Sequence, residues 1–187
     1  DGTLPGPEMV LLLAKLKAEA VVGRLVDGMP INGLILGGDS AFELDNILYG
    51  KPHHPHVARE RWYQQRGREG LLHSGHWIID HRDGVVGGAI GDVSTTAVRF
   101  AANITDTEIE AYIATGEPLQ VAGAFTIDSL GAPFISEVRG DPHAVVGLSL
   151  AQVRELLLHF DVAWPSLWNR GTDDVSHNGT GDVVDSP

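Results

Sequence analysis

The stretch Leu34-Ile35-Leu36-Gly37-Gly38-Asp39-Ser40 decides the expected fold. A short apolar run followed by glycines predicts a buried strand that ends in a tight loop. Ligands of open α/β sheets gather beyond the carboxyl ends of the strands, so Asp39 would stand where an acid can serve as a general base or hold a divalent cation. The same residues also suit an ordinary turn at a strand end, because Gly and Asp are both common in turns.

Helices and strands are expected on both sides of this stretch, from hydrophobic spacing and from turn residues. Helices are predicted over residues 8–22, 55–66, 105–116 and from 149 onward, and strands over residues 71–80 and 93–100, with a glycine-rich hairpin loop at 81–91. Asp45-Asn46 is typical of a two-residue hairpin turn, and Thr105 with Glu108 indicates a capping box at a helix start. This interleaving predicts an α/β or α+β fold with a mixed sheet.

The bulk composition predicts one globular domain over residues 1–170, followed by a disordered tail at 171–187 that is rich in Gly, Asp, Ser and Asn. The chain has 187 residues, no cysteine and a formal net charge of −12 at pH 7. That charge disfavours nucleic-acid polymers and anionic membranes as partners, and the apolar runs are too short to span a bilayer. The composition therefore indicates a cytoplasmic protein without a disulfide or a thiolate zinc site.

Few cations are available to a small polyanionic ligand, because the sequence contains only three lysines, Lys15, Lys17 and Lys51. Lys17 borders the apolar face of the first predicted helix, where a lysine usually buries its stem and keeps its ammonium group in water. Lys51 lies between Gly50 and Pro52, and a proline restricts the residue before it to extended conformations. The Lys51 ammonium group is thereby pre-positioned to meet an anion near Asp39; an exposed loop lysine is the alternative.

The nine histidines do not by themselves indicate a metal site. His53, His54 and His56 stand in a polar loop and are expected to be solvated. His73 and His76 are three positions apart on a predicted strand, so their side chains point to opposite faces and do not easily share an ion.

The order of these segments resembles the Maf family of nucleoside triphosphate pyrophosphatases. The likeness begins with residues 13–21, Asp39-Ser40 and Gly50-Lys51-Pro52, and it extends over about residues 9–160. Its further segments are Gly67-Arg68, His73-Ser74-Gly75-His76, Glu108–Tyr112, Gly116-Glu117-Pro118, Ala122–Asp128, Gly140-Asp141-Pro142 and Val145–Leu148. No single tripeptide is specific, whereas an ordered series of this length is.

The resemblance implies the fold and the reaction of that family. The implied fold is an α/β structure of the Maf and inosine-triphosphatase type, with a long mixed sheet flanked by helices in two lobes around a nucleotide cleft. The implied activity is hydrolysis of a nucleoside triphosphate between its α and β phosphates, with Mg or Mn as a divalent cofactor, in a homodimer. The implied role is house-cleaning of non-standard or pyrimidine nucleotides.

The resemblance also assigns roles to five residues. Asp39 matches the family's catalytic acid and is a candidate metal ligand, while Lys17 and Lys51 match its phosphate-binding lysines. Ser40 and Asp128 fall where the family tunes base selectivity, and many pyrimidine-acting members have Thr and Gln there. A carboxylate accepts hydrogen bonds but does not donate one unless it is protonated, so Asp128 leaves the preferred base open.

Two other hypotheses stay open from the sequence. The family's opening strand and its Ser-x-x-Arg loop, whose arginine grips phosphate, are not found in this sequence. Either the given sequence is truncated, or it omits an unseen leading segment. If the segment is truly absent, the protein is expected to be nearly inactive. That difference favours a non-catalytic, nucleotide-binding regulator linked to cell division and septum formation. A purine-directed triphosphatase of the inosine triphosphate type is the third hypothesis.

Overall fold

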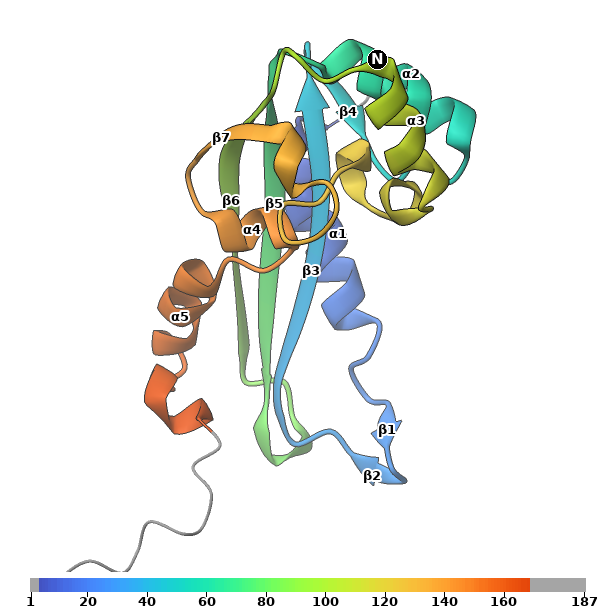
Figure 1. Cartoon of the computed structure of the whole chain (residues 1–187). Coiled ribbons are helices and arrows are strands. Elements are labelled where there is room, and N and C mark those ends of the chain that lie inside the picture. The colour runs from blue at the N-terminus through green and yellow to red at the C-terminus, as the bar shows by residue number, and fades with distance from the viewer. Residues whose placement is uncertain (1–3, 169–187) are drawn as a thin grey trace, which may run out of the picture.

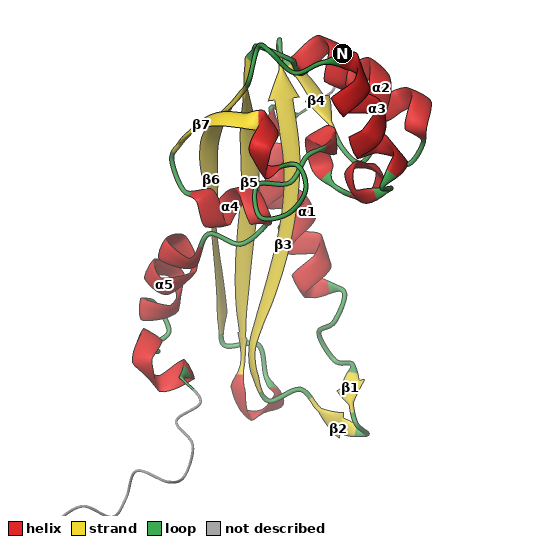
Figure 2. Cartoon of the chain, viewed as in Figure 1, coloured by secondary structure: helices red, strands yellow, loops and turns green. Residues whose placement is uncertain are grey.

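The computed structural model describes residues 4–168, and a five-stranded sheet in the order β4-β3-β5-β6-β7 lies at their centre (Figures 1 and 2). Helix α1 (Gly6–Glu19) covers one face of this sheet, while α4 (Pro142–Val146) and α5 (Leu150–Leu158) lie on the other. The expected α/β class, a long sheet flanked by helices, is confirmed. The tail predicted over residues 171–187 lies outside the described residues.

Three long strands form the body of the sheet, and they are β3 (Gly33–Leu44), β5 (Glu69–His81) and β6 (Gly88–Phe100). The short strands are β4 (Ile47–Tyr49) and β7 (Ile135–Arg139) in this sheet, and β1 (Leu25–Val26) and β2 (Met29–Pro30) in a separate hairpin. Helices α2 (Pro55–Gln65) and α3 (Asp106–Ala114) gather beside β4, at the opposite end of the molecule from the β1–β2 hairpin (Figure 1).

The sheet differs from the expected mixed sheet, because every pairing between described strands is antiparallel. Hairpins join β3 to β4 and β5 to β6, which makes those pairs antiparallel. The connection through α2 starts and ends at the same end of the sheet, since Leu71 near the start of β5 pairs with Glu43 near the end of β3. A parallel pair would need a crossover that returns the chain to the opposite end.

The Gly37-Gly38-Asp39-Ser40 stretch lies in the middle of β3, so the predicted loop at a strand end is wrong. Gly37 serves packing. A Cβ atom on Gly37 would collide with the carbonyl oxygen of Ala14 and lie 2.8 Å from the amide nitrogen of Ala18, both in α1. A Cβ atom on Gly75 in β5 would meet the same helix, 2.5 Å from the carbonyl oxygen of Val10. These glycines therefore let α1 cross the sheet at close range.

The local signals at the ends of helices and hairpins predicted the structure better than the Gly37-Gly38 pair did. The capping box at Thr105 and Glu108 is present at the start of α3. Asp45 and Asn46 both have positive φ, 54° and 62°, as a two-residue hairpin turn requires. The loop between β5 and β6 is shorter than expected, because these strands continue to His81 and restart at Gly88.

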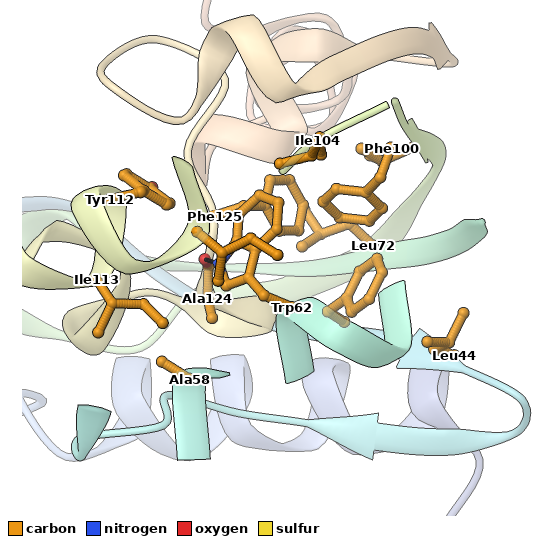
Figure 3. Packing of buried hydrophobic residues seen from close by; sticks show 13 residues of the cluster. Leu44, Ala58, Trp62, Leu72, Phe100, Ile104, Tyr112, Ile113, Ala124 and Phe125 are labelled. Atoms are coloured by element: carbon orange, nitrogen blue, oxygen red, sulfur yellow. Dashed lines mark hydrogen bonds between the residues drawn. The ribbon is translucent and has the colours of Figure 1, made fainter. Parts of the chain in front are cut away.

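The main hydrophobic core lies where α2 and α3 meet the sheet, and Figure 3 shows its side chains. Trp62 is fully buried and packs edge-to-face on Phe100 and Tyr112. Its indole N–H donates to the carbonyl oxygen of Ala124 at 2.9 Å, and Phe125 packs edge-to-face on Phe42. The core therefore fixes the segment after α3, which includes the 3-10 turns Glu117–Gln120, Ala122–Ala124 and Ala132–Phe134.

Smaller apolar clusters hold the other helices to the sheet. Ile78 packs with Val153, Leu156 and Leu157 of α5, and Ala18 of α1 packs with Ile35 and Ile79. The last described element is the 3-10 turn Trp164–Leu167. None of the helices within residues 4–168 is long and apolar enough to cross a membrane.

Candidate active site

One cavity of about 470 Å³ is lined by all five residues that the resemblance singled out, which are Lys17, Asp39, Ser40, Lys51 and Asp128. Its other lining residues are Gly38, Leu72, Gln120, Val121, Ala122, Phe125, Thr126, Val145, Val146 and Gly147. The lining residues come from α1, β3, β5, α4, the loop between β4 and α2, and the loops around the 3-10 turns. Segments distant in sequence thus meet around one space that has two ammonium groups and two carboxylates.

A larger cavity of about 970 Å³ lies beside the start of α1. It is lined mainly by apolar residues, with Glu43, Asn46 and His73 as its polar groups and without a lysine or an arginine. A polyanion finds no cation there. The smaller cavity is therefore the better candidate for a phosphate-bearing ligand.

The close crossing of α1 over β3 brings Lys17 to Asp39. The Lys17 ammonium group contacts the Asp39 carboxylate and donates to the carbonyl oxygen of Gly38 at 3.0 Å. The Asp39 side chain is 20% exposed and that of Lys17 is 57% exposed, so both remain open to the cavity. Because Gly37 sets the distance between helix and strand, a packing residue positions the ion pair.

Ser40 faces the opposite side of the sheet from Asp39, because successive strand residues alternate. Its hydroxyl lies 2.7 Å from the hydroxyl of Ser74 on β5, and Ser74 donates to the carbonyl oxygen of Ala144 in α4 at 2.8 Å. Both Asp39 and Ser40 line the cavity because it wraps around an edge of β3. On that edge, β4 pairs only with Phe42–Leu44 among the described strands.

The loop that holds Lys51 is fixed on both sides. Pro52 is buried, and the backbone N–H of His53 donates to the carbonyl oxygen of Leu119 at 3.0 Å. On the other side, the Arg61 guanidinium group donates to the carbonyl oxygen of Gly50 at 2.5 Å. The exposed Lys51 side chain therefore starts from a well-held backbone at the mouth of the cavity.

A single carboxylate organises the turn that holds Asp128. Glu117 accepts hydrogen bonds from the hydroxyls of Thr126 at 2.6 Å, Ser129 at 2.7 Å and Tyr112 at 3.0 Å, and from the backbone N–H groups of Leu130 and Gly131. Burial raises the pKa of Glu117, but these hydrogen bonds outweigh it and lower the pKa to about 2. The Glu117 carboxylate is thus ionised at neutral pH and closes the turn 126–131 around itself.

The α4 wall of the cavity is anchored by Asp141. Its carboxylate accepts from the backbone N–H of His143 at 2.9 Å and from the hydroxyl of Ser149 at 2.5 Å. Burial raises the pKa of Asp141, whereas the hydrogen bonds from Ser149 and His143 lower it, and the lowering wins. This cap holds α4, whose Val145 and Val146 line the cavity.

Within residues 4–168, no group of three or more His, Asp or Glu side chains is arranged to hold a metal ion. His73 contacts Thr95 and Glu43, whereas His76 contacts Gln152 and the backbone N–H of Ser149. The two histidines have different partners, as expected from their spacing. His53, His54 and His56 are exposed, also as expected.

Several residues of the site were not singled out from the sequence. Thr126, Phe125 and Val145 line the cavity, and Ser74 and Glu117 hold groups that do. The Ala122–Asp128 and Val145–Leu148 segments belong to the resemblance, which was the available signal for the lining residues. Nothing in the sequence indicates that Glu117 binds a turn ten residues later, because that contact depends on the tertiary fold.

Comparison with known proteins places the chain in a family. The family described as "Maf-like protein" matches residues 3–160. The chain is 62% identical over 169 residues to a nucleoside triphosphate pyrophosphatase of Leifsonia xyli subsp. xyli, covering 90% of this chain and 78% of that protein. Proteins with the same name from Salinispora tropica and Mycobacterium sp. (strain JLS) are 47% identical over 173 residues and 43% over 166 residues, covering 92% and 89% of this chain and 75% and 79% of theirs. The chain therefore belongs to the family of Maf-like proteins.

Proposed function

We propose that this protein hydrolyses a nucleoside triphosphate to a nucleoside monophosphate and pyrophosphate. The observation that supports this most strongly is the cavity in which Lys17, Asp39 and Lys51 meet. The relatives are named nucleoside triphosphate pyrophosphatases, which favours an enzyme over a non-catalytic regulator of cell division. Non-standard nucleotides are the proposed physiological substrates, and pyrimidine nucleotides are the other class to be tested.

In the proposed mechanism, Asp39 orients a water molecule and accepts its proton as the water oxygen attacks the α-phosphorus. The bond from that phosphorus to the bridging oxygen breaks, and the electron pair leaves with pyrophosphate. Lys17 and Lys51 stabilise the charge that develops on the phosphoryl oxygens and on the leaving group. Lys17 contacts Asp39 in the free protein, so its ammonium group is close to the proposed base before a ligand arrives.

A divalent cation, Mg or Mn, fits this site if it binds together with the triphosphate. Mg²⁺ is commonly held by one or two carboxylates together with substrate phosphates and water, without an all-protein cage. Asp39 supplies one partly exposed carboxylate, of which Lys17 contacts one oxygen, so the other oxygen is available as a ligand. When bound, the cation would neutralise phosphate charge.

We also propose a homodimer in the cytoplasm. A size-exclusion and light-scattering measurement on the purified protein tests the first point, with twice the mass of the 20.0 kDa chain as the expected result. Fractionation of the source cells tests the second, and recovery in the membrane or secreted fraction would contradict it.

The reaction itself is tested by its products. The protein is incubated with a panel of nucleoside triphosphates and MgCl₂ or MnCl₂, and ³¹P NMR follows the phosphorus species. Pyrophosphate and nucleoside monophosphate are expected in equal amounts. Release of orthophosphate with nucleoside diphosphate, or no product from any nucleotide, would contradict the proposal.

A further inference from the structure

The hydrogen-bonding polarity of the cavity follows from counting the protons of its hydroxyl groups. Thr126 has one hydroxyl proton, and it goes to the Glu117 carboxylate at 2.6 Å. An ionised carboxylate only accepts, so the direction of this bond is fixed. The low pKa of Glu117, about 2, keeps it ionised throughout the physiological range. The Thr126 hydroxyl also accepts from the backbone N–H of Gly131 at 3.3 Å. Thr126 therefore has no hydroxyl proton left for a ligand.

The hydroxyl proton of Ser40 is committed by the same reasoning. Ser74 is fully buried and donates its one proton to the carbonyl oxygen of Ala144, which only accepts. The hydrogen bond of 2.7 Å between the hydroxyls of Ser40 and Ser74 then requires Ser40 to be the donor. Ser40 is left with lone pairs for any ligand.

The acceptors share their segments with the apolar lining of the cavity. Thr126 and Asp128 follow Phe125, and Ala144, which receives the Ser74 proton, precedes Val145 and Val146 of α4. Apolar walls suit the faces of a planar base. Lys17 and Lys51 belong to other segments and suit the phosphates. Gln120 is the remaining lining side chain with amide protons, and it is exposed.

We propose that the cavity selects nucleotides whose base presents adjacent N–H donors, as guanine does, over those of uracil and thymine. This inference rests on the proposed function, which brings a nucleotide to the cavity. Guanine offers a ring N–H beside an exocyclic amine, a pair that matches the two oxygens of the Asp128 carboxylate. Uracil and thymine offer one N–H between two carbonyl groups, whose oxygens would face the lone pairs of Asp128 and Ser40 and receive no hydroxyl proton from Thr126.

The first test ranks nucleotides by base. GTP and dGTP are compared with UTP and dTTP by kcat/KM for pyrophosphate release, and by the Kd of their α,β-methylene analogues. A preference for guanine of at least about tenfold is expected, because the wrong base would leave the polar groups that it covers unpaired. Equal or better use of uracil or thymine in both assays would overturn the inference. If no nucleotide is hydrolysed, the proposed function fails and the Kd ranking still decides this inference.

A substitution at Asp128 tests the cause of the ranking. Asp128→Asn keeps the size of the side chain and adds amide donors, so the preference for guanine over uracil should fall by at least about tenfold. Asp83→Asn is the matched control, because it also removes one negative charge, lies in the β5–β6 turn and has a φ of 60° that Asn tolerates. An unchanged ranking in Asp128→Asn would overturn the inference.

A second substitution changes the donor state of Ser40 without altering Ser40 itself. Ser74→Ala removes the acceptor of the Ser40 proton, so Ser40 can donate into the cavity and the use of UTP relative to GTP should rise several-fold. Ser136→Ala is the control, because Ser136 also donates to a backbone carbonyl, that of Arg99, outside the cavity. If Ser74→Ala folds, by circular dichroism, and keeps the wild-type base ranking, the proton assignment is wrong. If it does not fold, the Asp128→Asn ranking decides.

Discussion

Two glycine-rich regions of this protein look alike in sequence and differ in the reason for their glycines. In the crossing of α1 over the sheet, Gly37 and Gly75 have extended backbones, and a Cβ atom on either would strike the helix backbone. In the turn between β5 and β6, Gly84 has a φ of +73° and no other atom within 4 Å of a Cβ position. The first region needs glycine for space and the second for a backbone conformation.

This difference indicates which of the two regions the geometry of the site depends on. The crossing sets the contact between Lys17 and Asp39, so a change in helix-to-strand distance would disturb the proposed chemistry. The β5–β6 turn lies at the end of the long strands nearer the β1–β2 hairpin (Figure 1), and it is not part of the cavity. Changes in the turn should therefore alter stability without altering the site.

The largest effect is expected from Gly37→Ala. Its Cβ would collide with backbone atoms of Ala14 and Ala18, which move only with the helix. We expect the free energy of unfolding to fall by about 3 kcal/mol, as for severe overpacking, and Tm by about 6 to 12 °C.

Gly38→Ala is the matched control for that substitution, because a Cβ there makes an ordinary contact of 3.7 Å with the carbonyl oxygen of Gly75. Urea denaturation of both variants measures the difference. Equal stability of the two would show that the glycine pair belongs to a flexible segment and not to a close crossing.

A smaller effect is expected from Gly84→Ala. An L-residue with left-handed φ costs about 1 kcal/mol, and space is not limiting at this position. Thermal unfolding should show this loss, whereas kcat/KM should stay at the wild-type value. Gly87→Ala is the control, since Gly87 lacks a positive φ and a Cβ would lie 3.5 Å from Asp80. A loss of activity in Gly84→Ala would contradict the separation of the two regions.

The smallest effect is expected from acid acting on the β5–β6 turn. The side-chain and backbone hydrogen bonds from Arg82 lower the pKa of Asp80 from 3.8 to about 2. Because the folded pKa is depressed, this contribution to stability is complete above pH 3.8 and is lost as the pH falls through about 2. Carboxyl ¹³C NMR should give the titration midpoint near 2, and Arg82→Ala should move it toward 3.8. An unchanged midpoint in that variant would contradict the assignment.

The sequence predicted local features better than tertiary ones. The Thr105–Glu108 capping box and the Asp45-Asn46 turn depend on neighbouring residues, so their signals are complete in the sequence. The Gly37-Gly38 pair was misassigned to a loop, because glycine occurs both in turns and at close backbone contacts within strands. Only the position of α1 distinguishes the two cases, and that position is a property of the whole fold.

The candidate site shows the same contrast between features that the sequence predicts and features that depend on the tertiary fold. The resemblance named five residues, and the fold gathers them around one cavity. Their roles in the reaction stay predictions. The hydrogen bonds that set the polarity of the cavity, through Ser74 and Glu117, were not predicted, because they join segments whose proximity is not encoded locally.

The most direct test of the central proposal compares turnover with binding in Asp39→Asn. We predict that pyrophosphate release falls by at least about 100-fold, because the proton acceptor is lost. The Kd for an α,β-methylene nucleotide, measured by isothermal titration calorimetry, should change by less than about threefold, because Lys17 and Lys51 are retained. Pyrophosphate release near the wild-type rate in Asp39→Asn, with Asp83→Asn as control, would contradict the account.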